Sequence, residues 1–370
     1  MADDPTTPSN PADEPWQERW KAFCAQLERT GQTVLASAPP GELHRAEGLR
    51  YVGRIARHAL QRFIEERDPA APVLGSLPKL GGDNPDYVYT GATISPDFEY
   101  RLTGTLGDAT YLGFGSYSGE VGTEEGLRLS GYLDGADLES DPDGRFEVVV
   151  SATKQEKNWL PMTSETTQLM VRELLLDRRE QRSAAFAIST RAGQDTESPF
   201  LPEGYAARLD EAGRYVEGAV AQFLDWSSHL ASRPNHVGPL DPALAAGAQG
   251  DPHTHYYGGY FEVADDEALV ITFTPPPCEY WNLQLCNHWL ESLDRPQHRV
   301  SINHQNASRR PDGEVIIVVS QQPPPATRAP LNWLDAAGHH QGCMFFRQVG
   351  TPDPCSPVCR VVHHSELNGS

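Results

Sequence analysis

The chain has 370 residues and a mass of 40.7 kDa, which exceeds one average domain and favours two domains or a duplicated one. Its hydrophobic share of 38% is enough to build real cores and argues against a wholly disordered chain. Its net charge of −21 repels phosphate backbones and anionic lipids, which argues against generic nucleic-acid or membrane-surface binding.

The beginning of the chain predicts helices. Apolar residues recur at steps of three and four over residues 16–27 and again over 49–63, the pattern of two amphipathic helices. The Ala-Pro-Pro-Gly sequence at 38–41 separates them. We therefore expect a helical segment over residues 16–79, preceded by a disordered acidic lead at 1–15.

Neither the beginning of the chain nor its later segments predict membrane targeting. The first residues lack the basic and apolar regions of a signal peptide, and no later stretch approaches the roughly 18 uninterrupted apolar residues of a membrane helix. The six cysteines are sparse and irregular, which argues against a disulfide framework. Cys355 and Cys359 could bind metal or sense redox state, although two incidental thiols are the simpler interpretation. We expect a cytoplasmic protein with no membrane or nucleic-acid partner.

Two long segments predict β-structure. Residues 83–178 consist of short alternating runs that Gly, Asp and Pro interrupt, which is typical of antiparallel strands. Similar runs resume over residues 255–349. We expect one β-unit at 80–180 and a second at 246–350, with a polar tail at 351–370.

A long helix is predicted between the β-units, within the segment 181–245. Apolar residues alternate steps of three and four without interruption from Leu209 to Leu230, which makes one apolar stripe over about six turns. A helix packed on a sheet of its own chain is the commoner cause of such a stripe. A coiled coil that binds a partner is the alternative, and it would make the chain an assembly protein or a homo-oligomer.

The two β-rich segments repeat each other. The offset between matching residues grows from 167 to 175 only where a loop must be longer, and their order is preserved. This repetition predicts two tandem copies of one sandwich-sized unit. The matching positions are Pro85–Gly91 and Pro252–Gly258, Tyr111 and Tyr280, Pro142–Gly144 and Pro311–Gly313, Asn158–Leu160 and Asn332–Leu334, and Arg172 and Arg347.

Two of the repeated residue pairs suggest buried polar groups. Trp159 and Trp333 are expected to fill the cores, with each indole N–H bonded to a partner. Arg172 and Arg347 lie in strand-like runs, where a lone charge needs a carboxylate or a cluster of carbonyls. We expect structural ion pairs at these arginines, and ligand clamps are the alternative.

The order of these motifs resembles a known bacterial family. Pro-Asp-Gly, a β-run, Asn-Trp-Leu-Pro and a strand containing Arg are similar to domain of unknown function 1214. That domain often accompanies domain of unknown function 1254, which the segment 84–89 resembles. The match covers roughly residues 80–178 and, more loosely, 251–349, where Asp335 replaces the proline after Asn-Trp-Leu. The resemblance implies jelly-roll-like β-sandwiches with helical additions, and it implies no activity.

Together these observations predict the fold class. We expect a β-dominated α+β protein with two tandem, related antiparallel β-sandwiches of the jelly-roll type. An N-terminal helical segment precedes them and a long helix connects them. Common catalytic signatures are absent from the sequence. The segment 113–119 lacks dinucleotide spacing, the lysine of a phosphate loop and the serine of a nucleophile elbow. We interpret it as a glycine-rich strand or bulge and expect no nucleotide cofactor.

The histidines are distributed unequally between the two units. Seven of the 13 lie within residues 251–349, and none lies within 80–178. On an extended strand, His253 and His255 point to the same face, which is ligand geometry for a metal ion. The carboxylate that a cupin motif places four or five residues later is missing. A divalent metal held by these two histidines and a third ligand is therefore one possible cofactor.

The segment from Trp281 to Trp289 places polar side chains among aromatic ones. Alternate residues of a strand share one face, and here that face carries Asn282, Gln284, Cys286 and His288. Such a face is too polar for a plain core and would suit the wall of a wet cavity. Hydrogen-bonding residues in a network at a strand edge are an equally good interpretation.

These residues suggest a small-molecule enzyme of the hydrolase or lyase type, with or without a metal. In this scheme His288 or His304 takes a proton, and Glu291 or Asp294 orients the imidazole. The pocket would lie in the second unit or between the units, and Asn282 or Arg347 would stabilise developing negative charge. Its predicted walls are Tyr89, Tyr256, Trp281, Asn282, His288 and His304. The alternative functions are a non-catalytic binder of a carbohydrate-like or aromatic ligand and an assembly protein.

Overall fold

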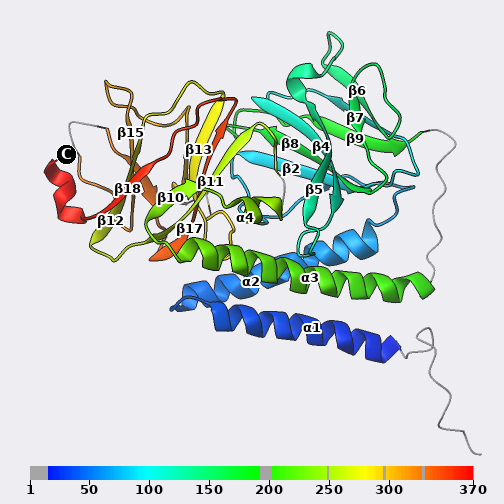
Figure 1. The fold of residues 1–370 in the computed structure, drawn as a ribbon, viewed down its shortest axis with the longest axis horizontal. Coiled ribbons are helices and arrows are strands. Elements are labelled where there is room, and N and C mark those ends of the chain that lie inside the picture. Colours follow the sequence, from blue (N-terminus) through cyan, green and yellow to red (C-terminus); the bar gives the residue numbers. More distant parts are fainter. Residues whose placement is uncertain (1–15, 192–201, 248–249, 295–296, 327–329, 370) are drawn as a thin grey trace, which may run out of the picture.

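The computed structural model describes residues 16–191, 202–247, 250–294, 297–326 and 330–369. It places two β-sandwiches side by side over a layer of three long helices (Figure 1). This β-dominated architecture of two tandem units confirms the predicted fold class.

The helix layer consists of two helices from the N-terminal segment and one that connects the units. The expected break after α1 is present, and α2 continues into one π-helical turn, η2. The apolar stripe of α3 is buried, with Leu209, Val216 and Phe223 at most 2% exposed, because α1, α2 and the sheets cover it. The stripe therefore packs within its own chain. The bounds are α1 (Trp16–Ser37), α2 (Glu42–Leu60), η2 (Gln61–Glu65), α3 (Pro202–Ala231) and the short α4 (Pro242–Ala246).

The first unit is a sandwich of two sheets with the strand orders β1-β2-β8-β4-β5 and β7-β6-β3-β9. The five-stranded sheet faces the helices, and its other face packs on the second sheet around Phe114, Val148 and Val171. A β-bulge interrupts β4 between Ser116 and Tyr117, within the glycine-rich segment predicted as a strand or bulge. The bounds are β1 (Gly75–Ser76), β2 (Tyr87–Thr93), β3 (Tyr100–Thr105), β4 (Tyr111–Gly119), β5 (Leu127–Asp134), η3 (Gly135–Asp137), β6 (Arg145–Ser151), β7 (Trp159–Pro161), β8 (Thr166–Leu174) and β9 (Ala185–Thr190).

The second unit repeats this topology strand for strand. Its sheets have the orders β10-β11-β17-β13-β14 and β16-β15-β12-β18. Even the parallel pair recurs, as β6 with β7 and as β15 with β16, whereas the other described ladders are antiparallel. The duplication predicted from the sequence is thus a duplication of structure. The bounds are β10 (His236–Pro239), β11 (Thr254–Glu262), β12 (Glu267–Phe273), β13 (Tyr280–Leu285), β14 (Ser301–Asn303), β15 (Val315–Ser320), β16 (Asn332–Asp335), β17 (Gln341–Val349), β18 (Val358–His363) and η4 (His364–Gly369).

Side-chain contacts repeat as well. The indole N–H of Trp159 donates to the carbonyl of Ser151 at 3.0 Å, and that of Trp333 donates to the carbonyl of Ser320 at 3.3 Å. The prediction that each repeated indole has a partner is therefore confirmed.

Four short edge strands lie outside the predicted limits of the units. They are β1, β9, β10 and β18, and each pairs with one neighbouring strand at the edge of its sheet. The predicted tail contains β18, which pairs with β12 along six residues and brings Cys359 opposite Ile271. Short, partly exposed edge strands carry little hydrophobic periodicity, so the sequence pattern does not reveal them.

The two units exchange polar contacts across their interface. The hydroxyl of Tyr111 in the first unit donates to Asp251 in the second at 2.7 Å. The matching tyrosine of the second unit, Tyr280, donates to Asp86 in the first at 2.9 Å. It also accepts from the side-chain amide of Asn84, the residue that matches Asp251, at 3.1 Å. Apolar side chains from both units, including Leu174, pack around these contacts. No helix in the described part of the chain is long and apolar enough to cross a membrane.

A close backbone contact joins α3 to the turn between β4 and β5. Gly122 in this turn has a φ of 80°, and an added Cβ at Gly218 in α3 would overlap its carbonyl oxygen. We expect Gly218→Ala to lower the free energy of unfolding by about 1–3 kcal/mol, because the helix must shift away from the turn. Among the described residues, open space would surround an added methyl at Gly53 in α2, so Gly53→Ala is the control. Urea unfolding should show the control to be up to about 1 kcal/mol more stable than the native chain.

Candidate functional site: a cavity between the units

A cavity of about 460 Å³ lies where the two β-units meet the helix layer. Strands β2 and β8 supply one wall and β11 and β17 the other, while α2, η2 and α3 complete the enclosure. A cavity of this size falls within the range of roughly 300–1,000 Å³ that holds small organic molecules. Its lining includes Tyr89, Arg172, Tyr256, Phe345 and Arg347 from the strands, and His58, Arg62, Phe223 and Trp226 from the helices.

Two buried arginines face this cavity from equivalent places in the two units. Arg172 lies opposite Tyr89 in the β2–β8 ladder, and Arg347 lies opposite Tyr256 in the β11–β17 ladder. Each arginine is 7% exposed. Among the described residues, neither has a carboxylate within ion-pairing distance, so the expectation of a carboxylate partner is wrong. A carbonyl contact, the other expected kind of partner, is present at Arg347.

The protein satisfies only part of the hydrogen-bonding capacity of these guanidinium groups. Arg172 donates to the hydroxyl of Tyr117, whose ring it also overlies at 5.4 Å. Arg347 donates to the side-chain oxygen of Gln284 at 2.7 Å and to the carbonyl of Gly82. Because each guanidinium has five N–H donors, most of them lack an acceptor among the described residues. Such donors in a concave site are well placed to bind an anion.

The acidic residues of the lining are committed to other partners. Glu120 forms a hydrogen-bonded ion pair with Arg62 at 2.8 Å. Asp83 accepts hydrogen bonds from the backbone N–H and the hydroxyl of Ser292. Asp251 accepts from two tyrosine hydroxyls and from a backbone N–H. The carboxylates therefore do not neutralise the two buried arginines by direct contact.

The remaining walls are largely apolar. Phe345 lies beside Arg347 with the guanidinium 5.3 Å from its ring centre, and Phe223 and Trp226 of α3 lie on the helix side. His58 of α2 also lines the cavity, and burial, followed by repulsion from nearby arginines, lowers its pKa to about 4. It is therefore a neutral group at physiological pH. The site combines an apolar body with cationic donors, which suits an organic anion.

Comparisons with known proteins agree with this fold. The family model described as "protein of unknown function (DUF1214)" matches residues 122–175 and 263–352. A crystal structure of an uncharacterized protein from Burkholderia cenocepacia is 37% identical and superimposes with a TM-score of 0.89. The match covers 94% of this chain and 98% of that chain. The chain belongs to the DUF1214 family.

More distant comparisons add no argument about function. A Vibrio parahaemolyticus protein of known structure is 11% identical, covers 84% of this chain and 96% of its own, and has a TM-score of 0.48. No curated protein matches this DUF1214 protein. The two segments that match the family model include Arg172 and Arg347, whereas Tyr89 and Tyr256 lie outside them.

Three residues that the sequence predicted for substrate binding meet in the cavity of this DUF1214 protein. Tyr89, Tyr256 and Arg347 all line it, although they are far apart in the chain. The cavity also lies between the units, which is one of the two places proposed from the sequence. The helix side of the site, including His58, was not predicted, because nothing in a local pattern shows which helix face covers a cavity.

His288 has surroundings that differ from the predicted scheme. Its Nδ1 lies 2.9 Å from the hydroxyl of Tyr260 and 3.2 Å from that of Ser227. Burial, with a smaller effect of His44, lowers the pKa of His288 to about 4. The expectation that Glu291 or Asp294 orients this imidazole is therefore wrong.

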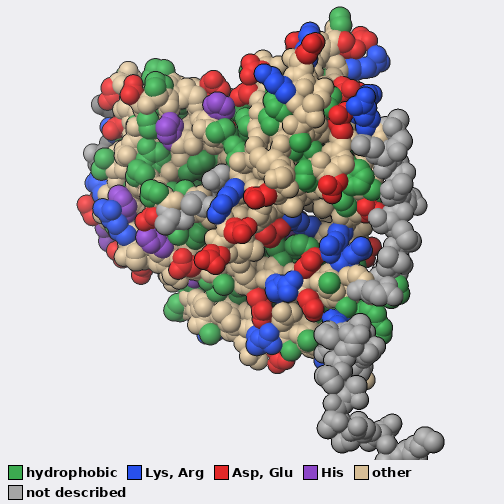
Figure 2. Space-filling view, turned by 45° about the vertical axis from the view of Figure 1, so that its right-hand side comes forward, with side chains coloured by type: hydrophobic (Ala, Val, Ile, Leu, Met, Phe, Trp, Pro, Cys, Tyr) green, Lys and Arg blue, Asp and Glu red, His purple; other side chains and the backbone are tan. Residues whose placement is uncertain are grey.

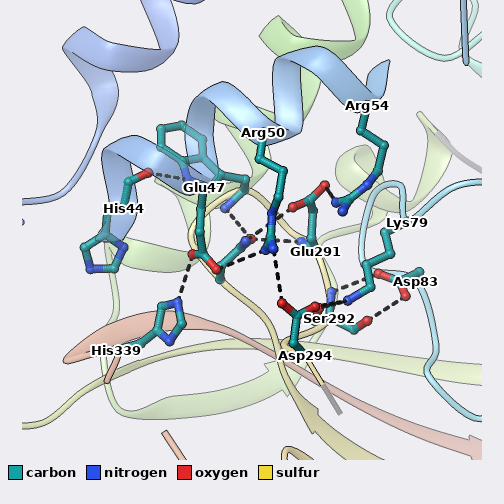
Figure 3. A network of polar contacts seen from close by, with 12 residues as sticks. His44, Glu47, Arg50, Arg54, Lys79, Asp83, Glu291, Ser292, Asp294 and His339 are labelled. Carbon is teal, nitrogen blue, oxygen red and sulfur yellow. Dashed lines mark hydrogen bonds and ion pairs between the residues drawn. The ribbon is translucent and has the colours of Figure 1, made fainter. Parts of the chain in front are cut away.

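Glu291 and Asp294 belong to a polar network that joins the second unit to α2 (Figure 3). Glu291 is ion-paired with Arg54, and Asp294 is ion-paired with Arg50 at 3.1 Å. Figure 3 shows both arginines descending from the same helix toward these carboxylates. The network docks α2 on the sheet, and neither Glu291 nor Asp294 lines the central cavity.

The other predicted wall residues lie beside the cavity or in a core. Trp281 is fully buried between the sheets of the second unit and packs on Phe273. Asn282 donates to the side-chain oxygen of Asn84 at 3.1 Å. The ring of His304 lies edge-on to Tyr280 with centres 5.8 Å apart. None of the three predicted wall residues is part of the cavity lining.

The two predicted metal ligands are not brought to a common site with a third one. His255 contacts the carbonyl of Thr351 at 2.9 Å, and His253 lies 3.8 Å from Asp134. Among the described residues, no group of three or more His, Cys, Asp or Glu side chains is arranged to hold a metal ion. Figure 2 shows that the histidines visible on this face gather on the second unit. They are separate surface groups there.

Proposed function

We propose that this DUF1214 protein binds a small organic acid with an apolar or aromatic body in the central cavity. The observation that supports it most is the pair of buried arginines without a carboxylate partner. Burying a charge without a counter-charge is unfavourable, and an anionic ligand would supply that charge. The apolar walls around Phe345 would hold the body of the ligand.

Binding is favoured over histidine-centred hydrolysis or elimination. His288 is enclosed by Tyr260 and Ser227 and does not line the cavity, so a ligand bound there would not reach it. The histidine that does line the cavity, His58, is a weak base because of its lowered pKa. A binder of an aromatic ligand, one of the alternatives suggested by the sequence, is close to the proposal made here.

Ligand titration tests the proposal. We expect aromatic and medium-chain carboxylates to raise the melting temperature of the protein, whereas the matching amides do not. Arg347→Gln should weaken carboxylate binding by about 10- to 100-fold, since a hydrogen bond to a charged group contributes about 1.5–3 kcal/mol. Isothermal titration calorimetry measures the loss directly.

The control is Arg145→Gln, because the Arg145 side chain is 70% exposed and lies outside the cavity. This variant should bind carboxylates like the native chain. Equal stabilisation by acids and amides, or unchanged affinity in Arg347→Gln, would contradict the proposal.

A further inference from the structure

The duplication supplies the cavity with two equivalent sets of hydrogen-bond donors. The first unit contributes Arg172 and Tyr89, which lie opposite each other in the β2–β8 ladder. The second contributes Arg347 and Tyr256, which lie opposite each other in the β11–β17 ladder. All four residues line the same cavity. A guanidinium with a neighbouring phenol is a donor set that fits one carboxylate.

The hydroxyl groups of both tyrosines are arranged as donors. The oxygen of Tyr89 accepts from the backbone N–H of Asn84 at 3.3 Å, five residues earlier. The oxygen of Tyr256 accepts from the backbone N–H of Asp251 at 2.9 Å, again five residues earlier. Each hydroxyl therefore keeps its own proton available. Burial raises the pKa of Tyr89 to about 12 and also raises that of Tyr256, so both protons stay in place at neutral pH.

The two donor sets act on one shared space. All four side chains line one cavity of about 460 Å³, and the guanidinium of Arg347 lies 5.9 Å from the ring centre of Tyr256. A single bound molecule can consequently lie between Arg172 and Arg347 and contact both sets.

Direct contacts decide how many acid groups the ligand needs. Among the described residues, the lining carboxylates contact Arg62, Ser292 and the tyrosine hydroxyls and not the two buried guanidinium groups. One ligand carboxylate would pair with one guanidinium and leave the free donors of the other without an anionic acceptor. Two carboxylates would give each guanidinium its own acceptor.

We propose that the ligand is a dicarboxylate whose two acid groups are separated by an apolar spacer. One carboxylate binds to Arg172 and the other to Arg347, the two tyrosine hydroxyls complete the donor sets, and the spacer lies against apolar side chains of the lining such as Phe345. This inference rests on the proposed function and specifies the ligand class for the same cavity.

Matched ligands test the inference. Hexanedioate is compared with hexanoate, and benzene-1,4-dicarboxylate with benzoate, by calorimetry on the native chain, Arg172→Gln, Arg347→Gln and the exposed control Arg145→Gln. For the diacid that binds more tightly of the two, the native chain should have an affinity at least about tenfold higher than for the matching monoacid. Each cavity variant should bind that diacid about as weakly as the native chain binds the monoacid. The control should match the native chain for every ligand.

The outcomes separate this inference from the proposed function. If monoacids and diacids bind with equal affinity, and both arginine variants weaken the monoacid, one carboxylate bridges the two arginines and the dicarboxylate is overturned, while the proposed function stands. If none of the four acids binds to the native chain, the dicarboxylate inference is overturned, and a wider acid panel that also fails removes the proposed function. Melting curves of the ligand-free variants establish that they are folded. If a glutamine variant is not folded, the corresponding lysine variant, Arg172→Lys or Arg347→Lys, replaces it. Lysine keeps the positive charge and removes the forked donor group.

Discussion

Arg54→Met will lower the free energy of unfolding by about 3–5 kcal/mol, because it leaves a buried carboxylate without its cation. The Glu291 side chain is only 1% exposed, and its ion pair with Arg54 links α2 to the second unit (Figure 3). Burial already raises the pKa of Glu291 against the lowering effect of Arg54. Without Arg54, the carboxylate will therefore take up a proton more readily, and the loss of stability will be larger at pH 8 than at pH 5.

Urea unfolding at the two pH values measures this effect, and the structure offers two comparisons. Arg50→Met removes neighbouring pairs with Asp294 and with Glu47. It should cost about 1 kcal/mol, because the Arg50 side chain is 43% exposed and Glu47 keeps its contact with His339. The double variant Arg54→Met with Glu291→Leu removes both charges and should recover most of the loss. A single variant within 1 kcal/mol of the native chain would show that the buried pair contributes little.

Acidification from pH 6.5 to pH 4 will destabilise the protein through two buried histidines. Burial lowers the pKa of His58 and of His288 to about 4 in the folded chain, from an ordinary value near 6.5. In this window the unfolded chain binds more protons than the folded one, so stability falls as pH falls. Each histidine accounts for about 3 kcal/mol across the whole window.

The measurement is the free energy of unfolding as a function of pH for the native chain and for His58→Gln and His288→Asn. Each variant should have a shallower dependence between pH 6.5 and 4, by about one proton at the middle of the window. Carboxylates titrate in the native chain and the variants alike, so the difference between the curves isolates the imidazole. Parallel curves would mean that the folded chain keeps these histidines open to protonation.

The repeated architecture could be predicted because its signals are local and occur twice. Residues 142–144 and 311–313 both form turns, and the Trp-Leu of each repeated Asn-Trp-Leu lies in a short strand parallel to its neighbour. The apolar residues of α3 from Leu209 onward also recur at steps of three and four, and this local period does not depend on the tertiary arrangement. These features depend on the chain nearby, and the structure reproduces them.

The partners of polar residues could not be predicted in the same way. Glu291 follows His288 by three residues, yet its partner is Arg54, which lies 237 residues away on another helix. Arg172 and Arg347 were expected to have carboxylate partners, but tertiary folding turns both toward a cavity. A pattern along one strand shows which face a residue occupies and says nothing of what the rest of the chain places opposite that face.

The contacts of Tyr111 with Asp251 and of Tyr280 with Asn84 have the form of an isologous dimer contact whose two subunits are joined into one chain, because Tyr111 matches Tyr280 and Asn84 matches Asp251. In a true homodimer every substitution would appear at both ends of the site. Joining the copies removes that constraint, and the place of Asp251 is occupied by Asn84 in the first copy. The same applies to the arginines, since Arg172 is held by a tyrosine and Arg347 by a glutamine and a carbonyl. The two ends of the cavity can therefore evolve separately, and a bound molecule does not have to be symmetrical.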